Sequence, residues 1–151
     1  MKHLILTSAI VAAFAAPVGA ETLTIGTATA QTGGLAYADV PTMQGMKLAI
    51  DEINAAGGID GATKIALLEK DVRSDPAQTS IAAQELADAG VSVIVLPGDS
   101  DPALAAIGVV SSAKIPAIST VASSPTLPQI GGDYMFSNFP GDNVQAAVSA
   151  K

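Results

Sequence analysis

The chain has 151 residues, with 7 Lys and Arg, 14 Asp and Glu, and a formal net charge of −7. Because it contains no cysteine, disulfides, thiolate chemistry and cysteine-ligated zinc are excluded. Its acidity argues against nucleic-acid binding, which needs a basic face.

Residues 1–20 have the pattern of a signal peptide. Lys2 and His3 form a short positive region, an apolar stretch follows over residues 4–16, and small residues stand at Val18 and Ala20. The apolar stretch is shorter than the ~20 residues that span a bilayer, and no cysteine follows it to carry a lipid. We therefore expect a soluble, exported and non-lipidated protein that does not insert into the membrane after cleavage. A buried N-terminal strand or an uncleaved anchor is the alternative.

Cleavage of the signal peptide would remove the residue type that several kinds of catalysis need. The single histidine is His3, so the mature chain, residues 21–151, has none. Ser-His-Asp catalysis, imidazole base catalysis and histidine-metal sites are then unavailable within it. We expect no catalytic residue, no metal and no cofactor.

The first elements of the mature chain alternate between strand and helix patterns. A strand is predicted over residues 22–28, followed by a glycine-rich loop at 31–34. A helix is predicted from apolar residues at i, i+3, i+4 and i+7, which would form its buried face: Met46, Ala49, Ile50 and Ile53. Gly57 and Gly58 offer a left-handed residue to end this helix.

The alternation continues to about Ala113. A strand over 65–70 precedes a helix that begins at Asp75-Pro76, with Asp as N-cap and Pro at the first helical position, and ends at Gly90. The apolar run 91–96 is typical of a central strand buried on both faces. Asp101-Pro102 repeats the same helix start, so Asp101 is predicted to be an N-cap as well.

Three further elements complete the chain. A fourth strand is predicted over 115–119, a Pro-flanked turn leads to an extended segment at 134–138, and Asp142 or Asn143 caps a last helix. That helix has no stop signal before its last residue, so we expect the chain to be truncated. A natural C-terminal helix docked on the sheet is the alternative.

This order of elements predicts the α/β class. Alternating strands and helices form an open, doubly wound and mainly parallel sheet with helices on both faces. Right-handed crossovers follow by rule. A core of Ile, Val, Leu and Ala is expected because only 3% of the residues are aromatic, and a chain of this length suits one domain.

Two polar loops follow adjacent strands of the predicted sheet, at residues 97–102 and 119–125. Both are rich in hydroxyl groups, including Ser100, Ser119 and Ser123. In open α/β sheets, ligands bind in the crevice outside the carboxyl ends of the strands. The loops therefore predict a cradle for a small polar ligand, and the missing histidine favours binding over catalysis.

Two other interpretations of the glycine-containing loops compete with this one. Gly98-Asp99-Ser100 is similar to the strand-end serine of GDS-type esterases, but no histidine is present to deprotonate Ser100. Gly33 and Gly34 do not fit the dinucleotide pattern, and we expect them to let the loop approach a ligand closely. Asp99 is the one acid for which the sequence suggests no structural role.

Four segments carry a resemblance that covers the mature chain. They are QTGGLAY at 31–37, GMKLAIDEINAAGGIDG at 45–61, DVRSDPAQTSIAA at 71–83 and IPAIS at 115–119. In order and spacing the chain resembles the N-terminal lobe of type I periplasmic solute-binding proteins, of the branched-chain amino acid (Leu/Ile/Val) binding family of ABC importers.

The resemblance implies an architecture and a function. Residues 21–151 would form the N-terminal lobe of a two-lobe ligand-binding domain, with the crossover to the second lobe beginning at about 140–151. The protein would be a monomeric periplasmic component of an ABC importer, delivering its solute to the permease subunits. The solute would be small and polar, an amino acid of branched-chain type or a related amide or carboxylate. The alternatives are a ligand-sensing lobe of a membrane receptor and a truncated GDS-type serine hydrolase.

The resemblance also implies which residues bind the solute. Asp99, Ser100, Ala122 and Ser123 correspond to positions that hold the polar head of an amino acid, and Tyr37 to an aromatic residue that packs on it. Asp99 departs from the family pattern, which often has a small hydroxyl residue there. An anion at this position would repel a ligand carboxylate, so either Asp99 pairs with an ammonium group or the ligand is not an amino acid.

Overall fold

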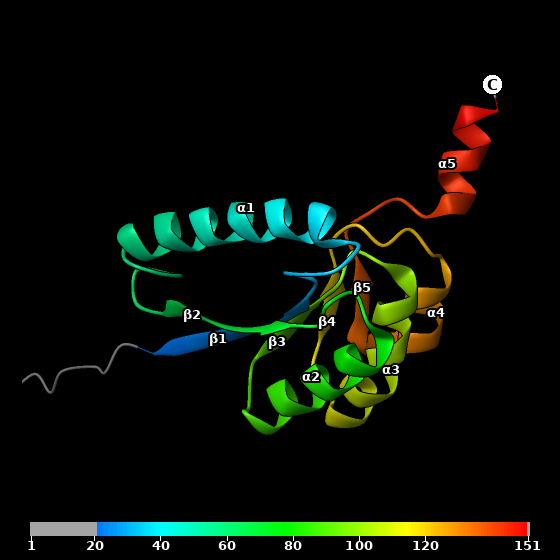
Figure 1. The fold of residues 1–151 in the computed structure, drawn as a ribbon. Coiled ribbons are helices and arrows are strands. Elements are labelled where there is room, and N and C mark those ends of the chain that lie inside the picture. Colours follow the sequence, from blue (N-terminus) through cyan, green and yellow to red (C-terminus); the bar gives the residue numbers. More distant parts are fainter. Residues whose placement is uncertain (1–20, 151) are drawn as a thin grey trace, which may run out of the picture.

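A computed structural model describes residues 21–150, so the predicted signal peptide lies outside the described residues. Figure 1 shows five parallel strands flanked by helices. The strands are β1 Thr22–Thr29, β2 Lys64–Asp71, β3 Val93–Leu96, β4 Ala117–Ser119 and β5 Met135–Ser137. The helices are α1 Ala36–Ala55, α2 Pro76–Asp88, α3 Ser100–Ala113, α4 Thr126–Gly131 and α5 Asp142–Ser149, with a 3-10 turn, η1, at Gly132–Tyr134. The predicted α/β class and parallel sheet are confirmed.

The strand order is β2-β1-β3-β4-β5, and every pairing is parallel. From β1 the chain first moves outward to β2, and it then passes back over β1 to build β3, β4 and β5 in the other direction. The order therefore reverses between β1 and β3. Such a switch point opens a crevice at the carboxyl ends of the two strands, because the loops that follow them leave toward opposite faces.

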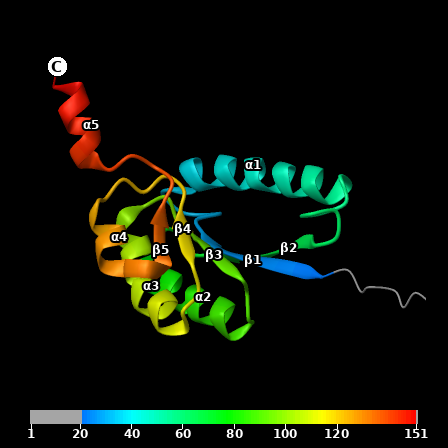
Figure 2. The ribbon, with the colours of Figure 1, turned by 180° about the vertical axis from the view of Figure 1, so that it is seen from behind.

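The helices cover the two faces of the sheet unequally. Helix α1 lies on one face, and α2 and α3 lie on the other with α4 beside them, as both views show (Figures 1 and 2). The buried core between the sheet and α2–α3 is aliphatic and includes Leu86, Ile94, Leu96 and Val110. Gly26 of β1 permits this packing, because a Cβ there would lie 2.9 Å from Leu86 Cδ2.

Several helix ends follow the local signals in the sequence. Asp75 caps α2 by accepting a hydrogen bond from Gln78 N at 2.8 Å, and Pro76 takes the first helical position. Helix α1 ends with Gly57 at φ +113°, and Gly58 N donates to Ile53 O at 2.8 Å. This is the 6→1 bond that closes a helix whose next residue is left-handed.

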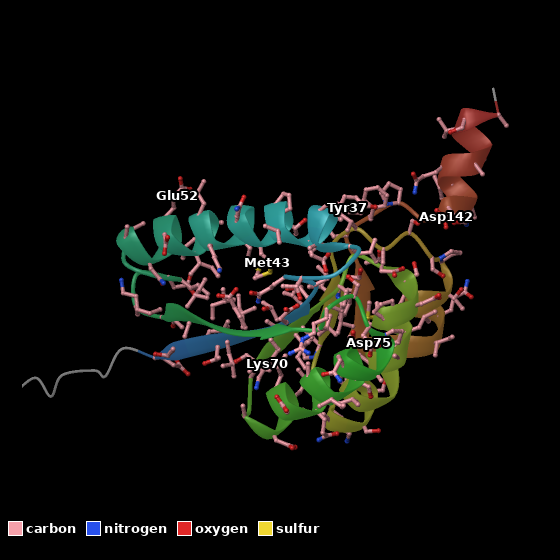
Figure 3. The ribbon with its side chains drawn as sticks, viewed as in Figure 1. Tyr37, Met43, Glu52, Lys70, Asp75 and Asp142 are labelled. Carbon is pink, nitrogen blue, oxygen red and sulfur yellow. The ribbon has the colours of Figure 1, made fainter. Side chains whose placement is uncertain are left out.

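Helix α1 begins ten residues before the apolar pattern suggested, and its predicted buried face was right for Ile50 and partly for Met46 but wrong for Ala49 and Ile53. Asp39, Met43 and Ile50 are the buried residues of α1, whereas Ala49 and Ile53 are exposed. Met43 points from α1 toward the sheet and Glu52 points away from it (Figure 3). Pro41 lies inside the helix, and together with Gly45 it conceals the helical pattern of the first turns.

Three further expectations need correction. Asp101 is not the N-cap of α3, because the helix begins at Ser100, two residues before the predicted start at Pro102, and Asp99 occupies the cap position. The Pro-flanked turn before β5 contains the short helix α4. Gly141, rather than Asp142 or Asn143, precedes α5, and no side chain caps that helix.

Helix α5 extends away from the sheet in both views (Figures 1 and 2). Its apolar side chains Val144 and Val148 are 55% and 70% exposed. No helix within residues 21–150 is long and apolar enough to cross a membrane.

The two Asp-Pro sequences offer a matched test of the caps. We expect Asp75→Ala to lower the free energy of unfolding by about 0.5–2 kcal/mol, because it removes a side-chain cap. Asp101→Ala removes only a charge in an exposed first turn, so its cost should be about 0.3 kcal/mol. Urea unfolding of the whole gene product measures both, and a larger loss for Asp101→Ala would contradict the assignment.

Candidate ligand-binding crevice

The two hydroxyl-rich loops lie side by side, as the sequence predicted. Strands β3 and β4 pair in parallel, with Leu96 opposite Ser119, so the loops after them leave the sheet at the same edge. Tyr37, in the first turn of α1, lies at this edge too (Figure 3). The predicted residues of the β3 loop, the β4 loop and α1 therefore share the carboxyl edge of the sheet.

Ser119 has a structural role that the sequence did not reveal. It is fully buried, its hydroxyl donates to Pro97 O at 3.1 Å, and its Oγ accepts from Ala122 N at 3.2 Å. The side chain thus joins the end of β3 to the loop after β4. It fixes the crevice from within and is not exposed to a solute.

Ala122 and Ser123 differ in what they offer a ligand. Ala122 is 1% exposed, and both of its backbone groups have partners, since its carbonyl accepts from Ser137 Oγ at 3.3 Å. Ser123 is half-buried, and its carbonyl accepts from Asp142 N at 2.8 Å. The Ser123 hydroxyl is therefore the better placed of the two for polar contact with a solute.

Asp99 and Ser100 form the start of α3. Asp99 has the extended backbone of an N-cap residue (φ −91°, ψ 136°), yet its side chain does not cap the helix. Its carbonyl accepts from Ala103 N at 3.2 Å, and Pro102 has no N–H. The N–H groups of Ser100 and Asp101 have no partner within the helix, as is usual for a first turn. A half-buried carboxylate and a helix N-terminus thus lie next to each other at the crevice.

The residue that organises this edge is Asp39, which the sequence analysis missed. Its side chain is buried, and its two oxygens accept from Ala30 N at 2.7 Å and from Gly98 N at 2.8 Å. One carboxylate therefore bridges the chain after β1 and the chain after β3, at the switch point of the sheet. If the sequence analysis had started this helix at Ala36, Asp39 would have fallen in its first turn and would have been a candidate site residue.

Burial raises the pKa of the Asp39 carboxyl above its ordinary value of 3.8. The N–H groups of Ala30 and Gly98 oppose this by stabilising the ionised form, and the negative charge of Asp99 adds to the increase. The desolvation of the carboxylate outweighs its two hydrogen bonds. The crevice therefore holds two nearby acids of different character, one buried and bonded, the other partly exposed.

Gly98 lies where three segments meet. A Cβ at this position would overlap Val121 Cγ2 and lie 2.8 Å from Asp39 Oδ1. The absence of a side chain lets the β3 loop pass between α1 and the β4 loop. Gly98 is thus required by close packing of the crevice itself.

The loop after β1 is held by a second aspartate. Asp71, at the end of β2, accepts from Gln31 N, Thr32 N and the Thr32 hydroxyl at 3.0, 3.1 and 2.6 Å. Burial alone would raise the pKa of Asp71, but the hydrogen bonds from Thr32, Arg73 and Gln31 lower it below 3.8. This loop leads directly into the turn that carries Tyr37.

The glycine at position 33 is required by the packing of this loop. Gly33 has φ +89°, and a Cβ there would overlap the Arg73 carbonyl. Gly33 thus allows a close backbone contact with the turn after β2, and the approach of this loop to a ligand stays a prediction. Leu35 N donates to Ser74 Oγ at 2.9 Å and completes the attachment.

Tyr37 is 77% exposed, so its ring is free to cover a solute.

The predicted site residues line neither of two cavities in the described chain. One, of about 280 Å³, lies at the opposite edge beside Thr22 and Ser92. The other, of about 220 Å³, lies at α1 and is lined by Gln31, Lys47 and Glu69 among others. Within residues 21–150 no cluster of His, Cys, Asp or Glu is placed to hold a metal.

The fold and the crevice define a class: an α/β lobe that presents hydroxyl, carboxylate and backbone groups to a small solute at a switch point. A family model described as periplasmic binding protein matches residues 22–151. The chain therefore belongs to the periplasmic binding protein family. The resemblance seen in the sequence is confirmed, and the family is one of binding proteins, not enzymes, as expected.

Individual relatives agree with the family. The Leu/Ile/Val-binding protein BraC3 of Rhizobium johnstonii is 31% identical over 97% of this chain and 40% of its own length. The structure of LivJ, a branched-chain amino acid transporter substrate-binding protein from Streptococcus pneumoniae in complex with isoleucine, has a TM-score of 0.78. It is 34% identical, over 87% of this chain and 39% of that one.

A third relative has a different ligand. It is a solute-binding protein of an ABC transporter from Rhodopseudomonas palustris in complex with 3,4-dihydroxy benzoic acid. Its TM-score is 0.65 and its identity 28%, over 77% of this chain and 32% of that one. The chain thus spans about two fifths or less of the length of these relatives.

The packing at Gly98 gives a prediction with a matched control. Gly98→Ala should lower the free energy of unfolding by about 1–3 kcal/mol, because the new methyl group forces the β3 and β4 loops apart. Gly108→Ala should be neutral or stabilising by up to about 1 kcal/mol, since Gly108 lies in α3 with open space around it. Thermal and urea unfolding measure both, and equal effects of the two substitutions would disprove the close packing.

Asp71 predicts a pH dependence of stability. Because its pKa is lowered on folding, its contribution is complete above pH 3.8 and is lost as the pH falls through the folded-state pKa. Asp71→Asn should therefore be less stable than the wild type at neutral pH, and the difference should shrink below about pH 4. Urea unfolding across this range tests it; a difference that stays constant into acid would contradict the role of the ionised carboxylate.

Proposed function

We propose that the chain forms the N-terminal lobe of the solute-binding component of an ABC importer. The observation that carries this proposal is the family match over residues 22–151, in a chain whose polar loops lie at the carboxyl edge of β3 and β4. The solute would be an amino acid of branched-chain type or a related amide or carboxylate. The protein would act in the periplasm as a monomer after signal-peptide cleavage, and would deliver its solute to the permease subunits.

The polar head of the solute would bind at the two loops. Its carboxylate would accept hydrogen bonds from the hydroxyls of Ser100 and Ser123 and from the N–H groups at the start of α3, where the helix dipole favours a negative charge. Ala122, which is buried and has both backbone groups bonded, would support the β4 loop beneath the solute. The exposed ring of Tyr37 would cover the apolar side chain of the solute.

Asp99 would select a solute that carries an ammonium group. Its carboxylate does not cap α3, and the loops at 97–102 and 119–125 contain no Lys or Arg to neutralise it. A solute with only a carboxylate would meet a like charge there, whereas a zwitterion would place its ammonium on Asp99 and its carboxylate on the helix N-terminus. This arrangement favours an α-amino acid over a simple acid such as a benzoate.

The second lobe would complete the site. Helix α5 and the extended chain before it leave the lobe at the carboxyl edge (Figure 1), which suits a crossover beginning at about residue 140. Closure of two lobes on the solute would then bury the groups that this lobe presents. Import follows when the closed form is recognised by the permease.

Calorimetry with three related probes tests both the function and the role of Asp99. The whole gene product should bind L-leucine, and it should bind 4-methylpentanoate, which lacks the ammonium group, about tenfold or more weakly. Asp99→Asn should lower the affinity for L-leucine by a similar factor. It should leave the affinity for 4-methylpentanoate unchanged or raise it, because the repulsion between the two carboxylates is removed. 3-Methylbutylamine, which lacks the carboxylate, should bind weakly to both proteins.

Asp101→Asn is the matched control, since it removes the same charge from an exposed residue two positions away. It should leave the affinity for L-leucine within about twofold, as expected for a surface substitution. Failure of the wild type to bind any branched-chain amino acid would contradict the proposed solute. Unchanged L-leucine binding by Asp99→Asn would contradict only the assignment of the ammonium contact.

A further inference from the structure

We propose that Asp39 is a positioning residue for solute binding: its carboxylate holds the β3 loop, through Gly98 N, in the geometry that presents Asp99 and Ser100 to the solute. This inference rests on the proposed function, since it concerns the same crevice. Asp39 itself is buried, so it would act without touching the solute.

The geometry supports a positioning role because one side chain fixes two distant segments. Ala30 and Gly98 lie 9 and 59 residues from Asp39 in the sequence, and both donate their N–H groups to it at less than 3 Å. These segments follow β1 and β3, the two strands whose loops diverge at the switch point. An acceptor at this point satisfies two N–H groups that the reversal of strand order leaves without a neighbouring strand.

A carboxylate suits this position better than any other side chain of its size. Its two oxygens are acceptors only, so both N–H groups are bonded at once. An asparagine of the same shape offers one acceptor, and its NH₂ group would face the other N–H. The charge is also costly to bury, because desolvation and the nearby Asp99 both raise the pKa of Asp39.

The position of Gly98 also affects the other residues of the crevice. Gly98 lies between Asp39 and Val121, with no room for a Cβ, so the β3 loop packs closely against both neighbours. Ser119 joins Pro97 to Ala122 in the same layer. Displacement of Gly98 would therefore move Asp99 and Ser100 relative to Ser123. Tyr37 precedes Asp39 by two residues in the same turn of α1, so its ring depends on the same anchor.

The test compares Asp39→Asn with Thr79→Val in the whole gene product, using L-leucine as the probe. Thr79 is the matched control: it is fully buried, its hydroxyl donates to Asp75 O at 2.8 Å, and it lies on α2, away from the crevice. Calorimetry should show a loss of L-leucine affinity of about tenfold or more for Asp39→Asn, and a change within about twofold for Thr79→Val. The unfolding temperatures of both variants are recorded, because a purely structural role would change those without changing the affinity of the folded protein.

A second measurement needs no ligand and leaves Asp39 in place. In the wild type, the amide proton resonances of Gly98 and Ala30 should shift together with the ionisation of the Asp39 carboxyl, followed by NMR from neutral pH into acid. Asp99 is the titratable group whose charge acts on Asp39. The other groups that face the Asp39 carboxylate are the N–H groups of Ala30 and Gly98. The Val121 methyl group packs beside Gly98. Spectra of Asp99→Asn separate the two titrations.

The outcomes are distinct. Tenfold weaker binding by Asp39→Asn, together with coupled titration of the Gly98 amide, supports the proposal. Equal affinity of Asp39→Asn and wild type, or a Gly98 amide that does not follow Asp39, overturns it. If the wild type binds no branched-chain amino acid, the proposed solute fails while the amide titration still decides whether Asp39 holds the loop.

Discussion

The crevice depends on one buried carboxylate at the point where the strand order reverses. In a doubly wound sheet the loops after the two central strands separate toward opposite faces, and their first N–H groups have no strand beside them. Here Asp39 satisfies both, bonding Ala30 N and Gly98 N from the first turn of α1. The cost is the desolvation of a charge, evident in its raised pKa. The gain is that the separation of the two loops is set by hydrogen bonds of fixed length, rather than by side chains that could repack.

The other loops of this edge are fixed in the same manner, each by a polar side chain from a different segment. Asp71 holds the loop after β1, Ser119 joins the β3 and β4 loops, and Ser137 holds the carbonyl of Ala122. Hydroxyl groups that look alike in the sequence therefore divide into two sets. Some connect segments through hydrogen bonds, as Ser119 does in the interior and Ser137 at the surface, and others, such as Ser123, are open to a solute.

This division explains what the sequence could and could not predict. Strands and helix ends depend on local signals, so Asp75 and Gly57 were identified in their observed roles. The role of Asp39 depends on partners 9 and 59 residues away, and Pro41 hid the helix turn that carries it. Ser119 was counted among the hydroxyl groups of the predicted cradle, because exposure cannot be judged from residue type, and it is fully buried. The assignments of Tyr37, Asp99, Ser100, Ala122 and Ser123 to the solute remain predictions.

The two acids of the crevice are electrostatically linked, and the link has a consequence for selectivity. The negative charge of Asp99 raises the pKa of Asp39, so the bonded and the exposed carboxylate oppose each other when both are ionised. An ammonium group placed on Asp99 would cancel that repulsion and favour the ionised form of Asp39, which is the form that holds Gly98 with both oxygens. A carboxylate solute without an ammonium group would add a further anion to the same edge. If Asp99 binds an ammonium group as proposed, the buried acid that shapes the β3 loop would reinforce that preference, and a zwitterionic solute would strengthen the loop that binds it.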